Sequence, residues 1–379
     1  MIRSFLSATL GGIFFIQVSA LAQGTVIDSE KAKFRVEVIA DGLENPWGIV
    51  LLPDGRYLVT ERPGRLRVIK DGVLDPRPVE GTPAVWAQGQ GGLLDVQLHP
   101  QYAENGWIYL SFSDPKDDAA LTKIVRGKLR GHAFVDQETI FQAPEAEYTK
   151  GGVHFGNRID FDGKGFLYFS IGDRGDKTTP ENNAQKLTNG KGKVHRIHDD
   201  GRIPADNPFV GTPDASPSIW SYGNRNPQGL RFDRRTGLLW ESEHGPRGGD
   251  EVNIIRKGLN YGWPIVTYGI NYSGTPISDK TGAPGIEAPV LHWTPSIAVG
   301  GIDFYYGDKF PGWKGNLFAT ALAHQKLVRM EVSEDNKVTH QEILLERSGR
   351  IRDVRSLGDG ALTLVYDEPG KVVRLVPAG

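Results

Sequence analysis

The stretch Trp47–Thr60, WGIVLLPDGRYLVT, joins an apolar strand, a Pro-Asp-Gly turn and a second strand rich in Leu, Tyr and Val. Arg65–Ile69 follows as a third strand of the same unit. Short apolar runs separated by turn residues are typical of antiparallel hairpins. The stretch therefore predicts one small antiparallel sheet.

The same phrase returns along the rest of the chain. Its later copies begin at Gly92, Arg158, Gln228, Gly300 and Ile351. Successive copies lie about 45 to 75 residues apart, which brackets the length of a four-stranded propeller blade and leaves room for inserted loops. Six copies predict an all-β fold, a six-bladed β-propeller.

Helical patterns are scarce in this sequence. No extended window places apolar residues at helical spacing, and 48 Gly and 24 Pro residues interrupt the chain throughout. A pair of β-sandwiches is the alternative all-β architecture, but it would not explain six returns of one turn phrase. We expect a single closed propeller domain over residues 23–379.

The first 22 residues have the features of an export signal. Met1–Arg3 is a short basic region, Leu6–Val18 is an apolar run, and Ala20–Ala22 has the small-x-small pattern of a cleavage site. The apolar run is interrupted by Gly and Ser, and no later stretch approaches the roughly 20 apolar residues of a transmembrane helix. We expect a periplasmic or secreted protein, cleaved after Ala22, without a membrane span.

Charge and cysteine content exclude several classes of function. Lys and Arg total 44 and Asp and Glu total 46, so the net charge of −2 gives no broad field for nucleic acid or an anionic membrane. The chain has no Cys, which excludes disulfides and thiolate metal sites. A small-molecule substrate is therefore favoured over nucleic acid as the partner.

Polar residues stand where the innermost strand of each blade should begin. These strands line the central channel of a propeller, and loops at one end build its pocket. Buried polar groups need partners, so several of them facing one cavity suggest a bound polar ligand. The residues at these positions are Gln90, His154, Arg225, Asn226, Arg350 and Arg352.

His154 is the candidate base. It lies in a glycine-rich entry, Gly151–Arg158, and an imidazole can take a proton at neutral pH, as an alcohol oxidation requires. Asp173 ends the paired strand of the same hairpin, so it can return to His154 and orient the ring. The alternative is a structural histidine that bonds a neighbouring blade, and for a lone His that alternative is the commoner one.

The segment Ser242–Glu251 is rich in carboxylates and in Gly and Pro turns. Irregular backbone of this kind can offer carbonyl and carboxylate oxygens to calcium, although a solvated acidic turn is an equally good interpretation.

Trp293 opens another loop, where it could stack on a planar ligand or lie buried in the core.

Several cofactor and catalytic motifs are missing from the sequence. There is no dinucleotide-binding glycine motif between a strand and a helix, no P-loop, and no Gly-x-Ser-x-Gly elbow. An oxidoreductase with this sequence would use a cofactor outside the nicotinamide-binding folds.

Three phrases carry a family resemblance, which runs from about Gly42 to the C-terminus. They are Gly89–Leu94, Ser221–Gly229 and Asn260–Pro264. The chain resembles the soluble aldose sugar dehydrogenases that depend on pyrroloquinoline quinone (PQQ), relatives of soluble quinoprotein glucose dehydrogenase. The resemblance implies a six-bladed propeller, PQQ in the central pocket, and oxidation of aldose sugars at C1 to lactones.

The resemblance also implies roles for individual residues. His154 would be the base toward the sugar C1 hydroxyl as hydride moves to the quinone, Asp173 would orient it, and Arg225 would lie near the reacting carbonyl. Residues that match cofactor-binding positions are Gln90, Arg225, Asn226, Arg350 and Arg352, with Trp293 at the rim. Arg side chains suit the three carboxylates of PQQ because their forked donors bind carboxylates in pairs.

Two calcium ions are implied as well. The carbonyls of Gly245 and Pro246 would bind the ion beside PQQ, where calcium polarises the quinone. Glu251 and the carbonyl of Tyr261 match a second, structural ion.

The sequence departs from the family pattern in two places. Glucose-oxidising members have a Lys that contacts the cofactor, whereas the match here is Ala323, with Lys326 out of register. The substrate loop near Trp293 is shortened, which suggests a more open pocket and broad aldose specificity.

The sequence leaves the electron acceptor and the choice between a monomer and a homodimer open. Two other functions compete, a calcium-dependent propeller lactonase or hydrolase and a noncatalytic binding propeller. The His154, Asp173 and arginine set argues against the binding propeller, which would not need an aligned base and carboxylate clamps.

Overall fold

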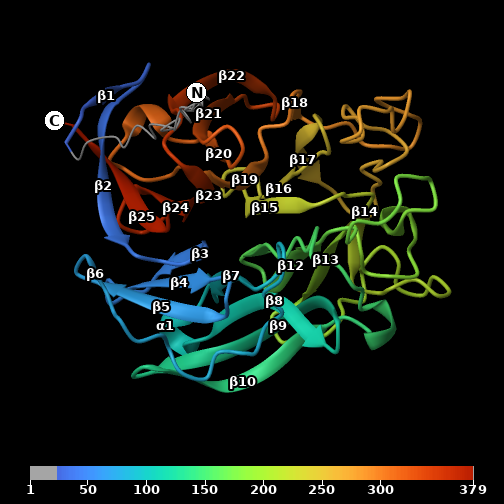
Figure 1. The fold of residues 1–379 in the computed structure, drawn as a ribbon, viewed down its shortest axis with the longest axis horizontal. Helices are drawn as coiled ribbons and strands as arrows, with labels where there is room; N and C mark the ends of the chain where they lie inside the picture. Colours follow the sequence, from blue (N-terminus) through green and yellow to red (C-terminus); the bar gives the residue numbers. More distant parts are fainter. Residues whose placement is uncertain (1–23, 379) are drawn as a thin grey trace, which may run out of the picture.

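The computed structural model describes residues 24–378, and the predicted export signal lies outside them. Within this range the chain forms six small antiparallel sheets arranged around a centre (Figure 1). Among these residues, helical structure is limited to α1 (Tyr102–Asn105) and the 3₁₀ turns Glu145–Glu147, Asn183–Gln185 and Pro311–Trp313. The six-bladed propeller expected from the repeats is confirmed.

The first three blades are each formed by four strands in sequence order. Blade 1 contains β3 (Pro46–Leu51), β4 (Tyr57–Glu61), β5 (Arg65–Lys70) and β6 (Val73–Leu74). Blade 2 contains β7 (Leu93–Leu98), β8 (Ile108–Lys116), β9 (Ala119–Arg130) and β10 (Ala133–Gln142). Blade 3 contains β11 (Ile159–Phe161), β12 (Phe166–Ile171), β13 (Lys193–His198) and β14 (Ile219–Tyr222).

The next two blades follow the same plan, and the sixth takes strands from both ends of the chain. Blade 4 contains β15 (Pro227–Phe232), β16 (Leu239–Glu243), β17 (Asp250–Ile255) and β18 (Leu291–Trp293). Blade 5 contains β19 (Val299–Phe304), β20 (Leu317–Ala321), β21 (Lys326–Val332) and β22 (Val338–Leu345). Blade 6 contains β23 (Arg350–Ser356), β24 (Leu362–Glu368), β25 (Lys371–Pro377), β2 (Lys33–Asp41) and β1 (Ile27–Asp28).

Strand β2 closes the ring. It pairs antiparallel with β25, so the blue N-terminal strand lies beside the red C-terminal blade in Figure 1. Its pairing places Phe34 opposite Pro377, and the side chain of Phe34 is fully buried. The sixth blade therefore depends on residues from both ends of the sequence.

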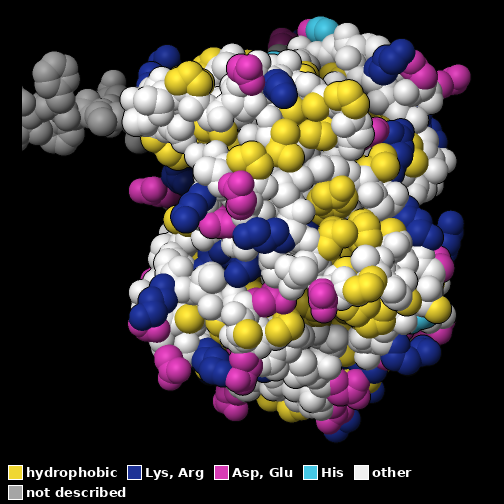
Figure 2. Space-filling view, turned by 90° about the vertical axis from the view of Figure 1, so that its right-hand side faces the viewer, with side chains coloured by type: hydrophobic (Ala, Val, Ile, Leu, Met, Phe, Trp, Pro, Cys, Tyr) yellow, Lys and Arg dark blue, Asp and Glu magenta, His cyan; other side chains and the backbone are white. Residues whose placement is uncertain are grey.

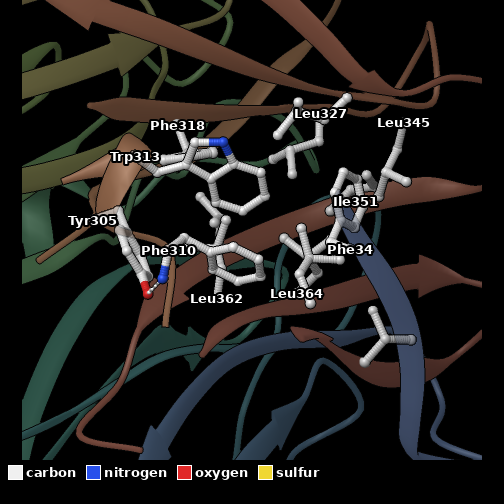
Figure 3. Packing of buried hydrophobic residues seen from close by; sticks show 14 of the residues in the cluster. Phe34, Tyr305, Phe310, Trp313, Phe318, Leu327, Leu345, Ile351, Leu362 and Leu364 are labelled. Atoms are coloured by element: carbon white, nitrogen blue, oxygen red, sulfur yellow. Dashed lines mark hydrogen bonds between the residues drawn. The ribbon is translucent and has the colours of Figure 1, made fainter. Parts of the chain in front are cut away.

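A large aromatic cluster packs where blades 5 and 6 meet. Phe34 meets Trp313 edge to face at 5.5 Å between ring centroids, and Phe310 stacks on Trp313 at 4.1 Å (Figure 3). The backbone N–H of Phe310 donates to the Tyr305 hydroxyl at 3.0 Å, which fixes the loop that carries the cluster. Burying each such ring contributes roughly 1.5–3 kcal/mol.

The innermost strands line the channel, and a layer of buried ions crosses it. Arg158, just before β11, places Nη1 3.0 Å from Asp95 of β7 and 3.0 Å from Asp353 of β23. Arg355 of β23 contacts the same two carboxylates at 2.8 and 2.7 Å. Blades 3 and 6 are opposite one another in the ring, so the pair of Arg158 and Asp353 spans the channel.

The face of the molecule drawn in Figure 2 has no dominant charge. Figure 2 shows basic and acidic side chains mixed over the face it draws, with apolar side chains between them. Within residues 24–378 no helix is long and apolar enough to cross a membrane.

Candidate active site

The centre of the candidate site is the pair of His154 and Asp173. His154 lies in the glycine-rich entry to β11, and Asp173 follows β12, so one hairpin carries both. His154 Nδ1 is 2.7 Å from Asp173 Oδ1, and the backbone N–H of His154 donates to Gln90 Oε1 at 2.8 Å. The structure thus brings together three residues singled out from the sequence.

Three further donors hold the Asp173 carboxylate. The indole N–H of Trp263 donates to Oδ2 at 2.7 Å, and Asn182 Nδ2 donates to the same oxygen at 3.3 Å. The backbone N–H of Gly175 donates to Oδ1 at 2.8 Å. With 1% of its side chain exposed, Asp173 is fixed from several sides and can hold the His154 ring in one orientation.

The backbone around His154 depends on glycine. A Cβ on Gly172 would lie 2.3 Å from the His154 carbonyl oxygen, so no larger residue fits there. His154 itself has φ of 53°, a left-handed conformation that a non-glycine residue adopts at an energetic cost. The tight packing of the hairpin forces His154 into this geometry.

The electrostatics of the pair favour a neutral imidazole. Burial lowers the pKa of His154 below its ordinary value, Asp173 opposes this, and the positive charge of Arg225 adds to the lowering. Burial alone would raise the pKa of Asp173, but His154 and Arg225 together bring it below its ordinary value. An ionised carboxylate only accepts hydrogen bonds, so the ring proton lies on Nδ1 and the basic lone pair on Nε2.

Arg225 and Asn226, before β15, extend the site. Arg225 Nη1 donates to the carbonyls of His244 and Gly245 at 3.0 and 2.9 Å, and its guanidinium lies 5.2 Å from the Trp263 ring centroid. Its buried Nε has no hydrogen-bond partner among the described residues. Asn226 accepts a hydrogen bond from Gln228 at 3.1 Å.

Two arginines of β23 complete the cationic side of the channel. Arg352 Nη1 donates to Gln228 Oε1 at 2.9 Å, and burial lowers the pKa of Arg352. Its buried Nε also lacks a partner within residues 24–378. Arg350 is more exposed and lies 3.4 Å from both Asp367 Oδ2 and the Leu322 carbonyl oxygen.

The position where the family has a lysine is occupied here by Ala323, which is exposed and has a short side chain. Ala323 follows β20, and its backbone N–H donates to the Ile297 carbonyl at 3.1 Å. The guanidinium of Arg350 reaches the preceding carbonyl, that of Leu322. A cation is therefore present beside this position even though Ala323 supplies none.

Three of the four expected metal ligands line one small cavity. This cavity, of about 10 Å³, is bordered by Gly245, Glu251 and Tyr261, together with Glu243. Burial and the neighbouring Glu243 raise the pKa of Glu251 well above its ordinary value. A cation in such a cavity would relieve the repulsion between these two buried carboxylates.

Pro246 and the Gly245 carbonyl differ from the other expected metal ligands. Pro246 does not border that cavity, and the Gly245 carbonyl already accepts a hydrogen bond from Arg225. Among residues 24–378, no group of three or more His, Asp or Glu side chains has the arrangement of a metal site.

Trp293 forms no hydrogen bond with His154 or Asp173. It ends β18, the outermost strand of blade 4, and its indole N–H donates to Gln341 of β22 at 3.0 Å. Its ring packs against the cluster between blades 4 and 5. These contacts leave the stacking of Trp293 on a planar ligand as a prediction.

Four residues of the site were not predicted from the sequence as site residues. Gln228 lies two residues after Asn226, and His244 directly follows Glu243, so their place at the start of β15 and just after β16 was a usable signal. Trp263 and Asn182 come from long insertions, and nothing local in the sequence points them at Asp173.

Comparisons with known proteins agree with this architecture. The profile of the family described as glucose/sorbosone dehydrogenase matches residues 43–374. An aldose sugar dehydrogenase of Escherichia coli, YliI, is 42% identical over 370 residues, covering 96% of this chain and 98% of the relative.

Two solved structures are similar over nearly the whole fold. The apo form of an aldose sugar dehydrogenase from Escherichia coli has a TM-score of 0.84 at 42% identity and covers 91% of this chain and 99% of that one. The PQQ-bound form of an aldose sugar dehydrogenase from Streptomyces coelicolor has a TM-score of 0.72 at 29% identity, covering 92% and 99%. The chain belongs to the glucose/sorbosone dehydrogenase family.

Proposed function

We propose that this chain is an exported, PQQ- and calcium-dependent dehydrogenase that oxidises aldose sugars at C1 to lactones, with His154 as the general base. The observation that carries the proposal is the His154–Asp173 pair beside Arg225 and Arg352. The relatives named as aldose sugar dehydrogenases support the substrate class.

The donor set of the channel fits PQQ. Arg225 and Arg352 each hold a buried Nε without a partner among the described residues, and Arg350 stands at the mouth. A buried donor without a hydrogen-bond partner lowers the stability of the folded protein. PQQ has three carboxylates, which would bind these donors through charge-assisted hydrogen bonds. The arginines, with Gln90 and Asn226, would therefore hold the cofactor.

His154 performs the proton transfer. Its neutral Nε2 accepts the proton of the C1 hydroxyl while the C1 hydrogen leaves as hydride, so the C1–O bond becomes a carbonyl. PQQ, when bound, supplies the two-electron acceptor for that hydride. Asp173 stabilises the imidazolium that forms, and an oriented base of this kind typically contributes about 10²–10⁴-fold to the rate.

Calcium would be bound near Gly245 and Pro246, and a second ion near Glu251 and Tyr261. The cavity beside Glu251 and Tyr261 supports the second ion, because the two carboxylates that border it, Glu243 and Glu251, share one cation, Arg225, among its lining residues. At the first site the Gly245 carbonyl would exchange its hydrogen bond from Arg225 for the metal.

Reconstitution tests the proposal. Purified protein is titrated with PQQ in the presence of calcium, and binding is followed by absorbance. Sugar-dependent reduction of an artificial acceptor dye is then measured with several aldoses. We expect saturable PQQ binding, activity on more than one aldose, and loss of activity but not of binding in His154→Ala.

Two results would contradict this function. Hydrolysis of a lactone without PQQ would favour a calcium-dependent lactonase. Absence of PQQ binding would favour a noncatalytic propeller. Full activity in His154→Ala would leave the enzyme class intact but would remove the base assigned here.

A further inference from the structure

A second cavity opens at the other end of the channel. It has a volume of about 520 Å³, within the range of ligand-binding pockets. It is bordered by residues at the far ends of the innermost strands, among them Leu98 of β7, Phe161 of β11, Phe232 of β15 and Ser356 of β23. No residue of the candidate active site borders this cavity.

The buried ion layer separates the two ends of the channel. Arg158, Asp95 and Asp353 are each at most 1% exposed, and their ion pairs cross the ring. Arg355, which contacts both carboxylates, borders the far cavity. A ligand in this cavity would therefore bind without entering the catalytic pocket.

The charges around the far cavity balance. Its lining includes four cations and four carboxylates, namely Lys164, Arg231, Arg234 and Arg355 with Asp160, Asp162, Asp233 and Asp303. Several are already paired: Arg231 lies 3.4 Å from Asp160 and 3.9 Å from Asp303. An ionic ligand would compete with these internal pairs, so the balance favours an uncharged one.

The hydrogen-bonding groups that remain suit hydroxyls. Arg231 is 5% exposed, and its Nη2 has no partner within residues 24–378. Asp160 and Asp303 accept from the backbone N–H groups of Phe232 and Ser356, each at 2.8 Å, and carboxylate oxygens have lone pairs for further donors. A hydroxyl both donates and accepts, so it can use the guanidinium and the carboxylates together.

Apolar side chains complete the lining. Phe161, Phe232, Leu98 and Leu357 border the same space as these charged groups. A sugar ring has C–H faces as well as hydroxyl edges and can pack against both kinds of group. We propose that this cavity is a second binding site, for a neutral saccharide, at the end of the channel opposite the catalytic pocket.

A neighbouring cavity extends the site. It has a volume of about 530 Å³, shares Arg234, Ser356 and Leu357 with the first, and continues along Asp308 and Lys309. A second sugar unit would lie there, so a disaccharide should bind more tightly than a monosaccharide.

A single fluorescent label tests the site, because the chain has no Cys of its own. Gly358 borders the neighbouring cavity beside Leu357, and a Cβ there would meet no atom within 4 Å. Gly358→Cys, labelled with an environment-sensitive dye, is titrated with glucose and maltose in the full chain without PQQ. Gly282→Cys, an equally open position on the 262–290 loop, carries the same dye as control.

We expect a saturable response at position 358 and none at 282, with maltose binding more tightly than glucose. Replacing the exposed lining residues Lys164 and Arg234 by Ala should weaken binding about tenfold for each donor lost. Arg347→Ala is the control, because Arg347 is exposed and borders neither cavity. His154→Ala should leave the response unchanged, which separates this site from the catalytic one.

Three outcomes would overturn the proposal. The first is the absence of a saturable response to either sugar at position 358. The second is a response that disappears in His154→Ala but survives in Arg234→Ala, which would place the sugar in the catalytic pocket. The third is saturation by acetate, phosphate or glycine without a response to sugar, which would assign the cavity to an ionic ligand.

Discussion

His154 Nδ1 lies 2.7 Å from Asp173 Oδ1, with the ring 13% exposed and the carboxylate 1% exposed. The buried partner is thus the fixed one, and the more exposed imidazole is oriented by it. This arrangement places the proton on Nδ1 and leaves Nε2 toward the channel, so the tautomer and the direction of the base are set by one carboxylate.

Replacing Asp173 by Asn should lower kcat by about 10²–10⁴-fold, because the amide does not fix the tautomer or stabilise the imidazolium. PQQ binding should change little, since the Asp173 side chain bonds none of the arginines that would hold the cofactor, and the variant keeps the backbone hydrogen bond from Asp173 N–H to the Arg225 carbonyl at 2.8 Å. Steady-state kinetics and a PQQ absorbance titration measure the two effects. Asp335→Asn, at an exposed turn, is the control, and equal losses of binding and kcat would contradict a role limited to orienting the base.

The pH dependence should follow His154. Burial lowers its pKa below the ordinary value, and the base acts when neutral, so kcat/KM should fall as the pH drops through that lowered pKa. Asp173 raises this pKa and Arg225 lowers it. Asp173→Asn should therefore move the acid limb to lower pH, and Arg225→Gln should move it to higher pH. Shifts in the same direction for both variants would rule out His154 as the titrating group.

Trp263 should act as a positioning residue. Its indole N–H donates to Asp173 Oδ2 at 2.7 Å, and a hydrogen bond to a charged group contributes about 1.5–3 kcal/mol. Trp263→Phe should lower kcat about 10- to 100-fold with a smaller change in KM. Trp240→Phe is the matched control, because its buried indole nitrogen has no partner in the described chain. Equal effects of the two substitutions on kcat would indicate a loss of packing alone.

The inner strands were predictable because each carries its own turn phrase, as Trp47–Thr60 does. The closing strand β2 was not, since its partner β25 lies more than 300 residues away and Lys33–Asp41 has no turn phrase of its own. His154 and Asp173 were found because they flank one hairpin. Trp263 was not assigned to Asp173, 90 residues away, because the sequence does not reveal where an inserted loop folds back.

Closure by β2 should dominate the stability of the ring. Phe34 is fully buried against Trp313, with 5.5 Å between the ring centroids, and it joins the aromatic cluster at the sixth blade. Phe34→Ala removes a large buried side chain and leaves a cavity, so the free energy of unfolding should fall by about 3–5 kcal/mol. Val38→Ala, on the same strand but 39% exposed, should cost far less. Urea unfolding of both variants measures the difference. If the two losses are similar, the aromatic contact does not hold the ring closed, and the strand pairing of β2 with β25 carries that role instead.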